Sequence, residues 1–436
     1  MGAEKKLRSG FTTGTCAAGA AKAAAIMLLK GKKPDYVKIQ TPKGTEANLP
    51  LFHVVREEEK ASCAVKKDAG DDPDVTDQTL IFASVEIYRG EEKPWFYRYE
   101  GNAPLYLTGG EGIGKVTKPG LACPPGKPAI NPVPRQMIFR QVDEVMAGRE
   151  LSYPLLIRIW APQGADLAQK TFNPRLGIVG GISILGTTGV VEPMSEAALM
   201  ATISLEIHMK AVEGVKRLIL TPGNYGETFV REQLGFSLDF GIQCSNFAAW
   251  AVEAAAKEGI QEVLFVGHAG KLIKVAAGMK NTHSKFGDGR MEAIWSFARN
   301  YVKAEEKEIL KKKILESNTT EEAAVLLRQA GILLQTMADA AQTASFWLGK
   351  WSGNRIKAET VFFSQDLGLL GKSRGADSLI ERLKGQTTEQ ERKEREYGES
   401  EQRNFIRNRS GAGRSGAYDF KGSKTDPAVS GDRHSP

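Results

Sequence analysis

The chain has 436 residues, 41% of them hydrophobic and 25% charged, which suits a protein of roughly two or three globular domains. Its net charge of +7 is a mild basic excess without the dense basic stripe of a nucleic-acid-binding protein, so no nucleic-acid partner is expected. The cysteines are far apart and form no C-x-x-C pair, which argues against a zinc ribbon and a secreted disulfide scaffold: Cys16, Cys63, Cys123 and Cys244.

The beginning of the chain imitates a signal peptide, with basic residues followed by an apolar run. Lys22 interrupts this run, which is too short and too rich in Ala to span a bilayer. Lys6 stands where an N-terminal myristoylation signal needs Ser or Thr. We therefore expect a cytoplasmic protein with no membrane segment.

The first part of the chain mixes strands with few helices, which predicts an N-terminal α+β domain over residues 1–150. Residues 12–31 begin with Thr and Gly, continue with strong helix formers and end at a Gly beside lysines, so they predict a helix. β-branched and aromatic residues predict strands, and an amphipathic pattern predicts one closing helix: strands at 35–42, 79–89 and 93–100, and the helix at 134–148.

From residue 151 onward, apolar strands alternate with helices, as at 155–162 and 261–270. This alternation predicts an α/β fold in which residues 151–384 form a doubly wound, Rossmann-like parallel sheet. Such sheets bind ligands beyond the carboxyl ends of their strands. Three loops are therefore expected at one edge of the sheet: 186–189, 221–226 and 267–271.

The end of the chain, residues 385–436, is charged and rich in Gly and Ser, with few apolar residues. Such a segment cannot bury enough surface to offset its ordering entropy. We predict that it is a disordered, dispensable tail.

A glycine-rich stretch at 109–120, GGEGIGKVTKPG, imitates a phosphate-binding Walker A loop. Val116 stands where that motif needs Ser or Thr to hold magnesium. Four prolines between residues 119 and 128 prevent the helix whose N-terminus would hold the phosphate. A phosphate-transferring enzyme is therefore excluded, and the stretch is either an anion-binding backbone nest or an ordinary hairpin turn.

An acidic turn, KKDAGDDPDVTD, carries four closely spaced carboxyl groups at Asp68, Asp71, Asp72 and Asp74. It lacks the spacing of a calcium loop. Like charges packed this closely are expected to raise at least one pKa, which a site can use for proton transfer. The alternative is a solvated turn, because Asp, Gly and Pro are common in turns.

Two further stretches contain candidate site residues. His268 and His283 lie in VGHAGKLIKVAAGMKNTHSKFGDGR, with His268 just beyond a predicted strand, where ligand contacts are expected. A capping role is the alternative for this histidine, and no metal site is expected because no third ligand is evident. In GGISILGTTGVVEPMSEAA, glycines would let a cofactor approach the backbone, and Ser195 is expected to cap a helix.

Taken together, several stretches resemble one family, the cobalt-precorrin-5B C1-methyltransferases of the CbiD type. They occur in family order and cover roughly residues 7–384, so the tail lies outside the resemblance. The matching stretches are LRSGFTTGTCAAGAAKAA, KKDAGDDPDVT, GGEGIGKVTKPGL, PAINPVPR, KTFNPRLGIVGGISILGTTGVVEPMS, GHAGKLIKVAAGMKNTHSKFGDGR and FFSQDLGLLGKSRGA.

The resemblance implies an enzyme of anaerobic cobalamin biosynthesis that methylates C-1 of a ring-contracted cobalt macrocycle, giving cobalt-precorrin-6A. S-adenosylmethionine would be the methyl donor, and cobalt would be present only as part of the substrate. This corrinoid substrate bears many carboxylates, which agrees with the basic excess of the chain. Positioning of the donor methyl against the ring carbon would supply much of the rate. A homo-oligomer and transient contacts with neighbouring pathway enzymes stay open.

These arguments together give three sets of candidate site residues. Catalytic roles are expected for Asp71, Asp72, His268 and His283. Contacts with the methyl donor are expected for Gly186, Thr187, Thr188, Gly223, Asn224 and Gly267. Contacts with the macrocycle are expected for Thr13, Thr15, Gly112, Lys115, Lys271 and Arg290.

Two alternatives accompany this assignment. The methyl donor could instead bind the turn at residues 12–15, whose following helix offers N–H groups. The protein could also be a non-catalytic carrier that passes a corrinoid intermediate between enzymes. Binding of S-adenosylmethionine separates a carrier from an enzyme.

Overall fold

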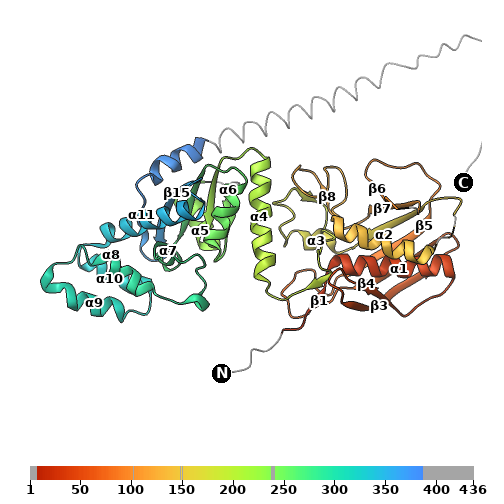
Figure 1. The fold of residues 1–436 in the computed structure, drawn as a ribbon, viewed down its shortest axis with the longest axis horizontal. Helices are drawn as coiled ribbons and strands as arrows, with labels where there is room; N and C mark the ends of the chain where they lie inside the picture. Colours follow the sequence, from red (N-terminus) through yellow and green to blue (C-terminus); the bar gives the residue numbers. More distant parts are fainter. Residues whose placement is uncertain (1–6, 102, 148, 150, 237–240, 386–436) are drawn as a thin grey trace, which may run out of the picture. The chain divides into compact units, whose positions relative to one another are not determined.

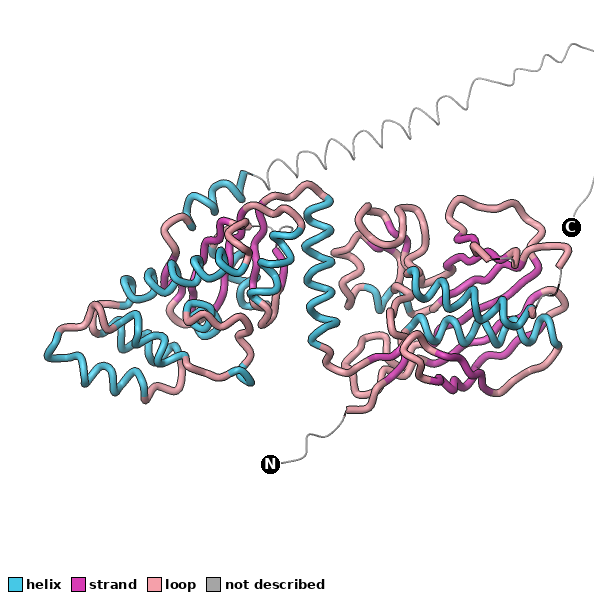
Figure 2. The backbone as a smooth tube through the Cα atoms, viewed as in Figure 1, coloured by secondary structure: helices cyan, strands magenta, loops and turns pink. Residues whose placement is uncertain are grey.

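The structure of the chain is a computed structural model that describes residues 7–101, 103–147, 149, 151–236 and 241–385 (Figure 1). All of the predicted tail beyond residue 385 lies outside these described residues. Strands and helices alternate in a mixed α/β arrangement that contains several sheets (Figure 2). The fold class predicted from the sequence is therefore confirmed at the level of a mixed α/β protein.

Helix α1 (Thr13–Lys30) forms where the sequence predicts it. The Thr12 side chain accepts a hydrogen bond from the N–H of Thr15 and so caps the helix, and Gly31 ends it in the left-handed conformation. Its small alanines are nearly all buried, because the helix packs against helix α2 (Pro132–Met146) and the strands beneath it. The predicted closing helix at 134–148 corresponds to α2.

A seven-stranded sheet forms the layer under α1 and α2, with the order β2-β3-β4-β5-β9-β7-β6. Neighbouring strands are antiparallel except for β7 and β9, which are parallel. The strands are β2 (Tyr36–Gln40), β3 (Glu46–Arg56), β4 (Lys60–Lys66), β5 (Leu80–Ile87), β6 (Tyr97–Arg98), β7 (Leu105–Gly109) and β9 (Leu155–Trp160).

Strand β9 is the first strand that the sequence places in the second domain, yet it pairs with β5 and β7 of this sheet. The alternation of strands and helices that begins at residue 151 therefore does not mark the start of a new sheet. An apolar strand followed by a helix looks the same in the sequence whichever sheet it joins, because strand pairing is a long-range choice.

Two short antiparallel ladders join distant parts of the chain. Strand β1 (Gly10–Phe11) pairs with β11 (Val190–Val191), and β8 (Lys115–Val116) pairs with β10 (Ile178–Val179). The stretch at 176–186 thus forms only a two-residue strand and isolated bridges. The expectation that the loop at 186–189 lies at the edge of the parallel sheet is wrong, since no strand of that sheet precedes the loop in the described part of the chain.

A five-stranded sheet contains the predicted parallel strands, in the order β13-β12-β14-β15-β16. The first four are parallel and β16 is antiparallel to β15. The parallel pairing is confirmed for the strands at 217–221 and 262–268. The strands are β12 (Arg217–Thr221), β13 (Gly241–Gln243), β14 (Glu262–His268), β15 (Lys357–Ser364) and β16 (Gly368–Lys372).

Helices connect and cover these strands, and Ser195 caps α4 as predicted by accepting a hydrogen bond from the N–H of Ala198. Helix α11 packs against β15, β16 and α7. None of the described helices combines the length and hydropathy needed to cross a membrane. The helices are α3 (Gly164–Ala168), α4 (Glu196–Val212), α5 (Asn224–Gln233), α6 (Ala248–Lys257), α7 (Ala269–Ala276), α8 (Arg290–Ala298), α9 (Lys307–Leu315), α10 (Thr320–Gln329) and α11 (Leu333–Trp351).

The buried apolar residues form two large cores. One core runs from Cys16 to Ile184 along the chain and lies around α1 and the seven-stranded sheet. The other runs from Ile203 to Leu370 and lies around the five-stranded sheet and α11. The chain therefore passes from the first core to the second between residues 184 and 203. This is about 40 residues after residue 151, where the alternation of strands and helices begins in the sequence.

Candidate functional site

A cavity of about 240 Å³ brings together stretches that are far apart in the sequence. Its lining comes from the start of α1, the acidic turn after β4, the segment 171–185, and α4. Polar and apolar side chains share this lining: Thr12, Thr13, Lys67, Asp74, Thr76, Thr171, Phe172, Asn173, Leu176, Ile182, Ser183, Leu185, Val191, Thr202 and Leu205.

Lys67 and Asp74 form an ion pair in this cavity. Lys67 directly follows β4 and is 1% exposed, and its Nζ lies 2.7 Å from Oδ2 of Asp74. The N–H and hydroxyl of Thr76 donate to the other carboxylate oxygen, at 2.7 and 2.6 Å. Burial pushes the pKa of Asp74 upward, but the Lys67 ammonium and the Thr76 hydrogen bonds outweigh it and lower the pKa. Asp74 is therefore a carboxylate at neutral pH.

The segment 171–185 is held by hydrogen bonds between its own polar side chains. Asn173 donates through Nδ2 to the carbonyl of Gly181 at 2.8 Å and accepts from the Ser183 hydroxyl at 3.0 Å. Thr13 at the start of α1 accepts from the N–H of Leu185 at 2.9 Å. These bonds join the wall of the cavity to the first turn of α1.

The first turn of α1 has little free hydrogen-bonding capacity. The N–H of Gly14 donates to the carbonyl of Leu185, and that of Thr15 donates to the Thr12 hydroxyl. The Thr15 hydroxyl donates to the carbonyl of Gly189 at 2.7 Å. The predicted macrocycle contact Thr15 thus has a structural partner, and Thr13 is the one of the pair that lines the cavity.

Most carboxylates of the acidic turn also have structural partners. Asp68 forms an ion pair with Arg8, whose guanidinium hydrogen bonds lower the pKa of Asp68. Asp71 accepts from the N–H of Arg8 at 2.7 Å, and Asp72 accepts from the N–H of Met194 at 2.8 Å. The expected rise in pKa from crowded like charges does not occur at Asp68 and Asp74, where hydrogen bonds and nearby cations outweigh burial and lower the pKa.

The glycine-threonine loop meets α1 rather than the parallel sheet. Gly186 has a φ of 126°, and a Cβ added there would lie 2.4 Å from the Thr12 hydroxyl, so this close approach requires glycine. Thr187 and Thr188 are exposed, and the Thr188 hydroxyl bonds locally to the carbonyl of Val190. The structure therefore does not bring Gly186, Thr187 and Thr188 together with the other predicted donor contacts.

Gly112 and Lys115 belong to the stretch that imitates a Walker loop. A Cβ at Gly112 would lie 1.8 Å from the carbonyl oxygen of Ala161, which explains the glycine by close backbone packing. Lys115 is exposed and begins the short strand β8, so no helix follows the glycines. The exclusion of a Walker A loop is confirmed.

The carboxyl ends of β12 and β14 bring Gly223, Asn224, Gly267 and Lys271 to one edge of the parallel sheet. Lys271 donates to the carbonyl of Pro222 at 3.3 Å, and burial lowers its pKa. The buried hydroxyl of Thr221, the last residue of β12, has no hydrogen-bond partner among the described residues. This edge therefore keeps one unused polar group beside the start of α5.

Both predicted histidines cap helices. Nδ1 of His268 accepts from the N–H of Gly270 at the start of α7, and Nε2 lies 2.6 Å from Glu321. His283 caps a short 3₁₀-helix by accepting from the N–H of Lys285. Arg290 pairs with Asp288, and its guanidinium lowers the pKa of that carboxyl. The capping alternative describes His268 in this structure, while His283 is an exposed residue.

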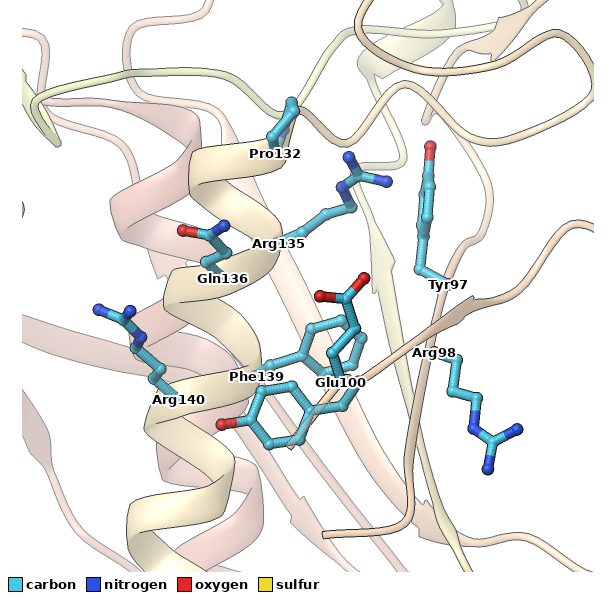
Figure 3. Close-up of a pocket in the computed structure, with 9 residues that line it drawn as sticks. Tyr97, Arg98, Glu100, Pro132, Arg135, Gln136, Phe139 and Arg140 are labelled. Atoms are coloured by element: carbon cyan, nitrogen blue, oxygen red, sulfur yellow. The ribbon is translucent and has the colours of Figure 1, made fainter. Parts of the chain in front are cut away.

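A second cavity, of about 320 Å³, lies between α2 and β6 (Figure 3). Arg135 of α2 extends toward Tyr97, with its guanidinium carbon 4.1 Å from the ring centroid. Burial raises the pKa of Tyr97, whose hydroxyl donates to the carbonyl of Pro128. In the same cavity lining, the rings of Tyr99 and Phe139 stack with their centroids 5.2 Å apart. The cavity is basic and aromatic, and none of the predicted site residues lines it.

Three polar residues that line the first cavity were not predicted as site residues: Lys67, Asn173 and Ser183. One signal in the sequence pointed toward Lys67. A lysine directly before four closely spaced acids is a candidate ion-pair partner for one of them, and Lys67 stands in that position. Nothing in the sequence distinguishes it from Lys66, which is exposed, because the register of β4 decides which lysine enters the core.

Comparison with known proteins places the chain in a family. The model described as CbiD matches residues 1–193, and the model described as the CbiD C-terminal domain matches residues 281–374. A protein from Ruminiclostridium cellulolyticum named cobalt-precorrin-5B C(1)-methyltransferase is 43% identical over 83% of this chain and 90% of its own length. One of the same name from Alkaliphilus metalliredigens is 42% identical over 89% of this chain and 98% of its own length.

A solved structure is also similar in sequence, the crystal structure of the cobalamin biosynthesis protein CbiD from Archaeoglobus fulgidus. It is 28% identical and covers 65% of this chain and 84% of that chain, with a TM-score of 0.33. The fold defines a mixed α/β protein with two large cores and, at Lys67, a cavity lined by both polar and apolar side chains. The chain belongs to the CbiD family.

Proposed function

We propose that this chain is a cobalt-precorrin-5B C1-methyltransferase that uses S-adenosylmethionine and forms cobalt-precorrin-6A in cobalamin biosynthesis. The observation that carries this proposal is the likeness to methyltransferases of that name, at 42–43% identity over 90–98% of their length. The cavity at Lys67 supports it, because it gathers side chains from three of the stretches on which the family resemblance rests.

The proposed reaction moves one methyl group as a cation equivalent. Carbon C-1 of the macrocycle supplies the electron pair for the new C–C bond, and the C–S bond of the sulfonium breaks. S-adenosylhomocysteine leaves with the electron pair of that bond. The protein's part is to hold the methyl in line with the ring carbon, at about 3 Å, and to exclude water.

For the methyl donor we propose the carboxyl edge of the five-stranded sheet. The strand order β13-β12-β14-β15 matches the 2-1-3-4 arrangement of doubly wound, Rossmann-like sheets, which bind ligands where the order reverses. That point lies between β12 and β14, beside Gly223, Asn224 and Gly267. The unpartnered Thr221 hydroxyl at the same edge supports this choice.

For the macrocycle we propose the cavity at Lys67 and the residues around it. Thr13 lines this cavity, and the exposed Thr187 and Thr188 lie two and three residues after its wall residue Leu185. We therefore assign these two threonines to the macrocycle rather than to the donor. Lys271 and Arg290 stay proposed contacts for its carboxylates, and Asp71, Asp72 and His283 stay candidates for proton handling.

The test is an assay of the purified full chain with cobalt-precorrin-5B and methyl-labelled S-adenosylmethionine. We expect one labelled methyl group per macrocycle and one equivalent of S-adenosylhomocysteine. A matched reaction with S-adenosylhomocysteine in place of the donor controls for non-enzymatic change. A protein that binds the macrocycle but neither binds the donor nor transfers the label would be a corrinoid carrier, and the proposal would be wrong.

A further inference from the structure

Lys67 is a lysine buried as deeply as the apolar core. Its side chain is 1% exposed, and it is among the largest fully buried side chains of the described residues. A lysine ammonium carries three hydrogen-bond donors. The described residues provide one partner for Nζ, the Asp74 carboxylate at 2.7 Å. Two donors therefore lack a protein acceptor, at a place where unsatisfied donors are costly.

The neighbours of Lys67 do not compete for these two donors. Oδ1 of Asp74 already accepts two hydrogen bonds from Thr76. The side-chain oxygen of Asn173 accepts from Ser183, and Thr13 is engaged with the segment at 183–185. Lys67 is thus the lining residue whose charged N–H donors lack acceptors. A ligand that carries an anionic hydrogen-bond acceptor would satisfy them.

The apolar part of the lining limits the size of that ligand. Phe172, Leu176, Ile182 and Leu185 form the walls together with Val191. A volume of about 240 Å³ is below the 300–1,000 Å³ usual for a whole drug-sized ligand, so it suits one arm of a larger molecule. An arm with a short apolar stem and a terminal carboxylate fits both the apolar walls and the Lys67 ammonium.

We infer that Lys67 binds a peripheral carboxylate of the anionic macrocycle and so orients the ring for methylation. This inference rests on the proposed function for the identity of the ligand. The Lys67 ammonium would then lie between two carboxylates, its own partner Asp74 and the arm of the ligand. The two Thr76 hydrogen bonds spread the charge of Asp74, which weakens its repulsion of the incoming carboxylate.

The test compares two variants that differ only at residue 67. Asp74→Asn removes the ion pair and keeps the ammonium, whereas Lys67→Met combined with Asp74→Asn removes both charges at similar volume. Binding of cobalt-precorrin-5B is measured by absorbance titration without methyl donor. We expect the double variant to bind about 10- to 100-fold more weakly than Asp74→Asn, the range for a lost hydrogen bond to a charged group. S-adenosylmethionine should bind both variants equally.

Two controls separate this effect from general charge and from misfolding. Arg135→Gln removes a cation from the second cavity, so its effect on binding measures the general field of the protein. If the double variant does not fold, as judged by its near-ultraviolet circular dichroism, the wild-type chain is titrated with monoamides of the macrocycle. One monoamide isomer should then bind about 10- to 100-fold more weakly than the others.

The inference is wrong if Asp74→Asn and the double variant bind the macrocycle equally, if Arg135→Gln causes the same loss, or if all monoamides bind alike. Wild-type methyl transfer, measured in parallel, tests the proposed function separately. A wild-type chain that binds the macrocycle through Lys67 without methylating it would overturn the methyltransferase proposal alone. A chain that methylates normally but binds independently of Lys67 would overturn this inference alone.

Discussion

The Lys67 ammonium and the Asp74 carboxylate lie 2.7 Å apart in the lining of a cavity, although Asp74 comes seven residues after Lys67 along the chain, in the acidic turn. The pair fixes the turn across the end of β4, because the backbone of Lys67 also exchanges hydrogen bonds with Gln78 and Thr79. A buried ion pair of this kind is costly to break by removing one partner, since the other charge stays buried.

The first prediction concerns stability against acid. The pKa of Asp74 is lowered in the folded chain, so its stabilising effect is complete above the unfolded value of about 3.9 and is lost as the pH falls through the folded pKa. Asp74→Asn should lower the free energy of unfolding by about 2 kcal/mol at pH 7. The loss should shrink below about pH 4. Urea unfolding at a series of pH values measures both effects.

Asp68→Asn is the matched control for this series. Asp68 also has a lowered pKa, but its pair with Arg8 is largely exposed to solvent. Exposed ion pairs contribute only about 0–1 kcal/mol. Equal losses for the two variants at pH 7 would show that Asp74 behaves as a surface carboxylate.

A second prediction separates two threonines of the predicted site. Thr13 is buried and its hydroxyl bonds the backbone at Ser183 and Leu185, so Thr13→Val should lower the free energy of unfolding by about 1–3 kcal/mol. Thr188 is exposed and its hydroxyl bonds only the nearby backbone of Val190, so Thr188→Val should change the free energy of unfolding by no more than about 0.5 kcal/mol. Chemical denaturation of both variants decides the order, and the reverse order would contradict the assigned contacts.

A third prediction tests the acidic turn as a proton-handling site. Asp71 and Asp72 each accept a backbone N–H, and asparagine keeps an oxygen acceptor at the same place. Asp71→Asn and Asp72→Asn should therefore fold normally, and the variant that removes a proton-handling carboxylate should lower the kcat for methyl transfer about 100-fold or more at an unchanged melting temperature. Wild-type kcat in both variants would show that the acidic turn is only structural.

The fourth prediction concerns the cysteines. All four thiols are buried, and burial raises the pKa of Cys16, Cys63 and Cys244 to about 12. These three are therefore neutral thiols at pH 8, and a neutral thiol is a poor nucleophile. Mass spectrometry after treatment with iodoacetamide should find them unlabelled in the native chain and labelled after denaturation. Rapid native labelling of any of the three would show that its surroundings open.

The sequence by itself determined the elements whose signals are local. The helix at 13–30 follows from a threonine cap, a run of alanines and a terminal glycine, all within one segment. The parallel strands β12 and β14 follow from short apolar runs between helices. The exclusion of a Walker loop needed only the prolines after Lys115, since proline prevents a helix wherever the segment lies.

Only the tertiary structure decided how these elements combine. Strand β9 and the loop at 186–189 belong with α1 and the first sheet because pairing and packing are choices between segments far apart in the chain, and periodicity carries no record of the partner. The role of Lys67 could not be predicted from the sequence for the same reason, because it depends on strand pairing. Its neighbour Lys66 has the same chemistry, and the register of β4 alone sends one lysine to the solvent and the other to Asp74 in the cavity.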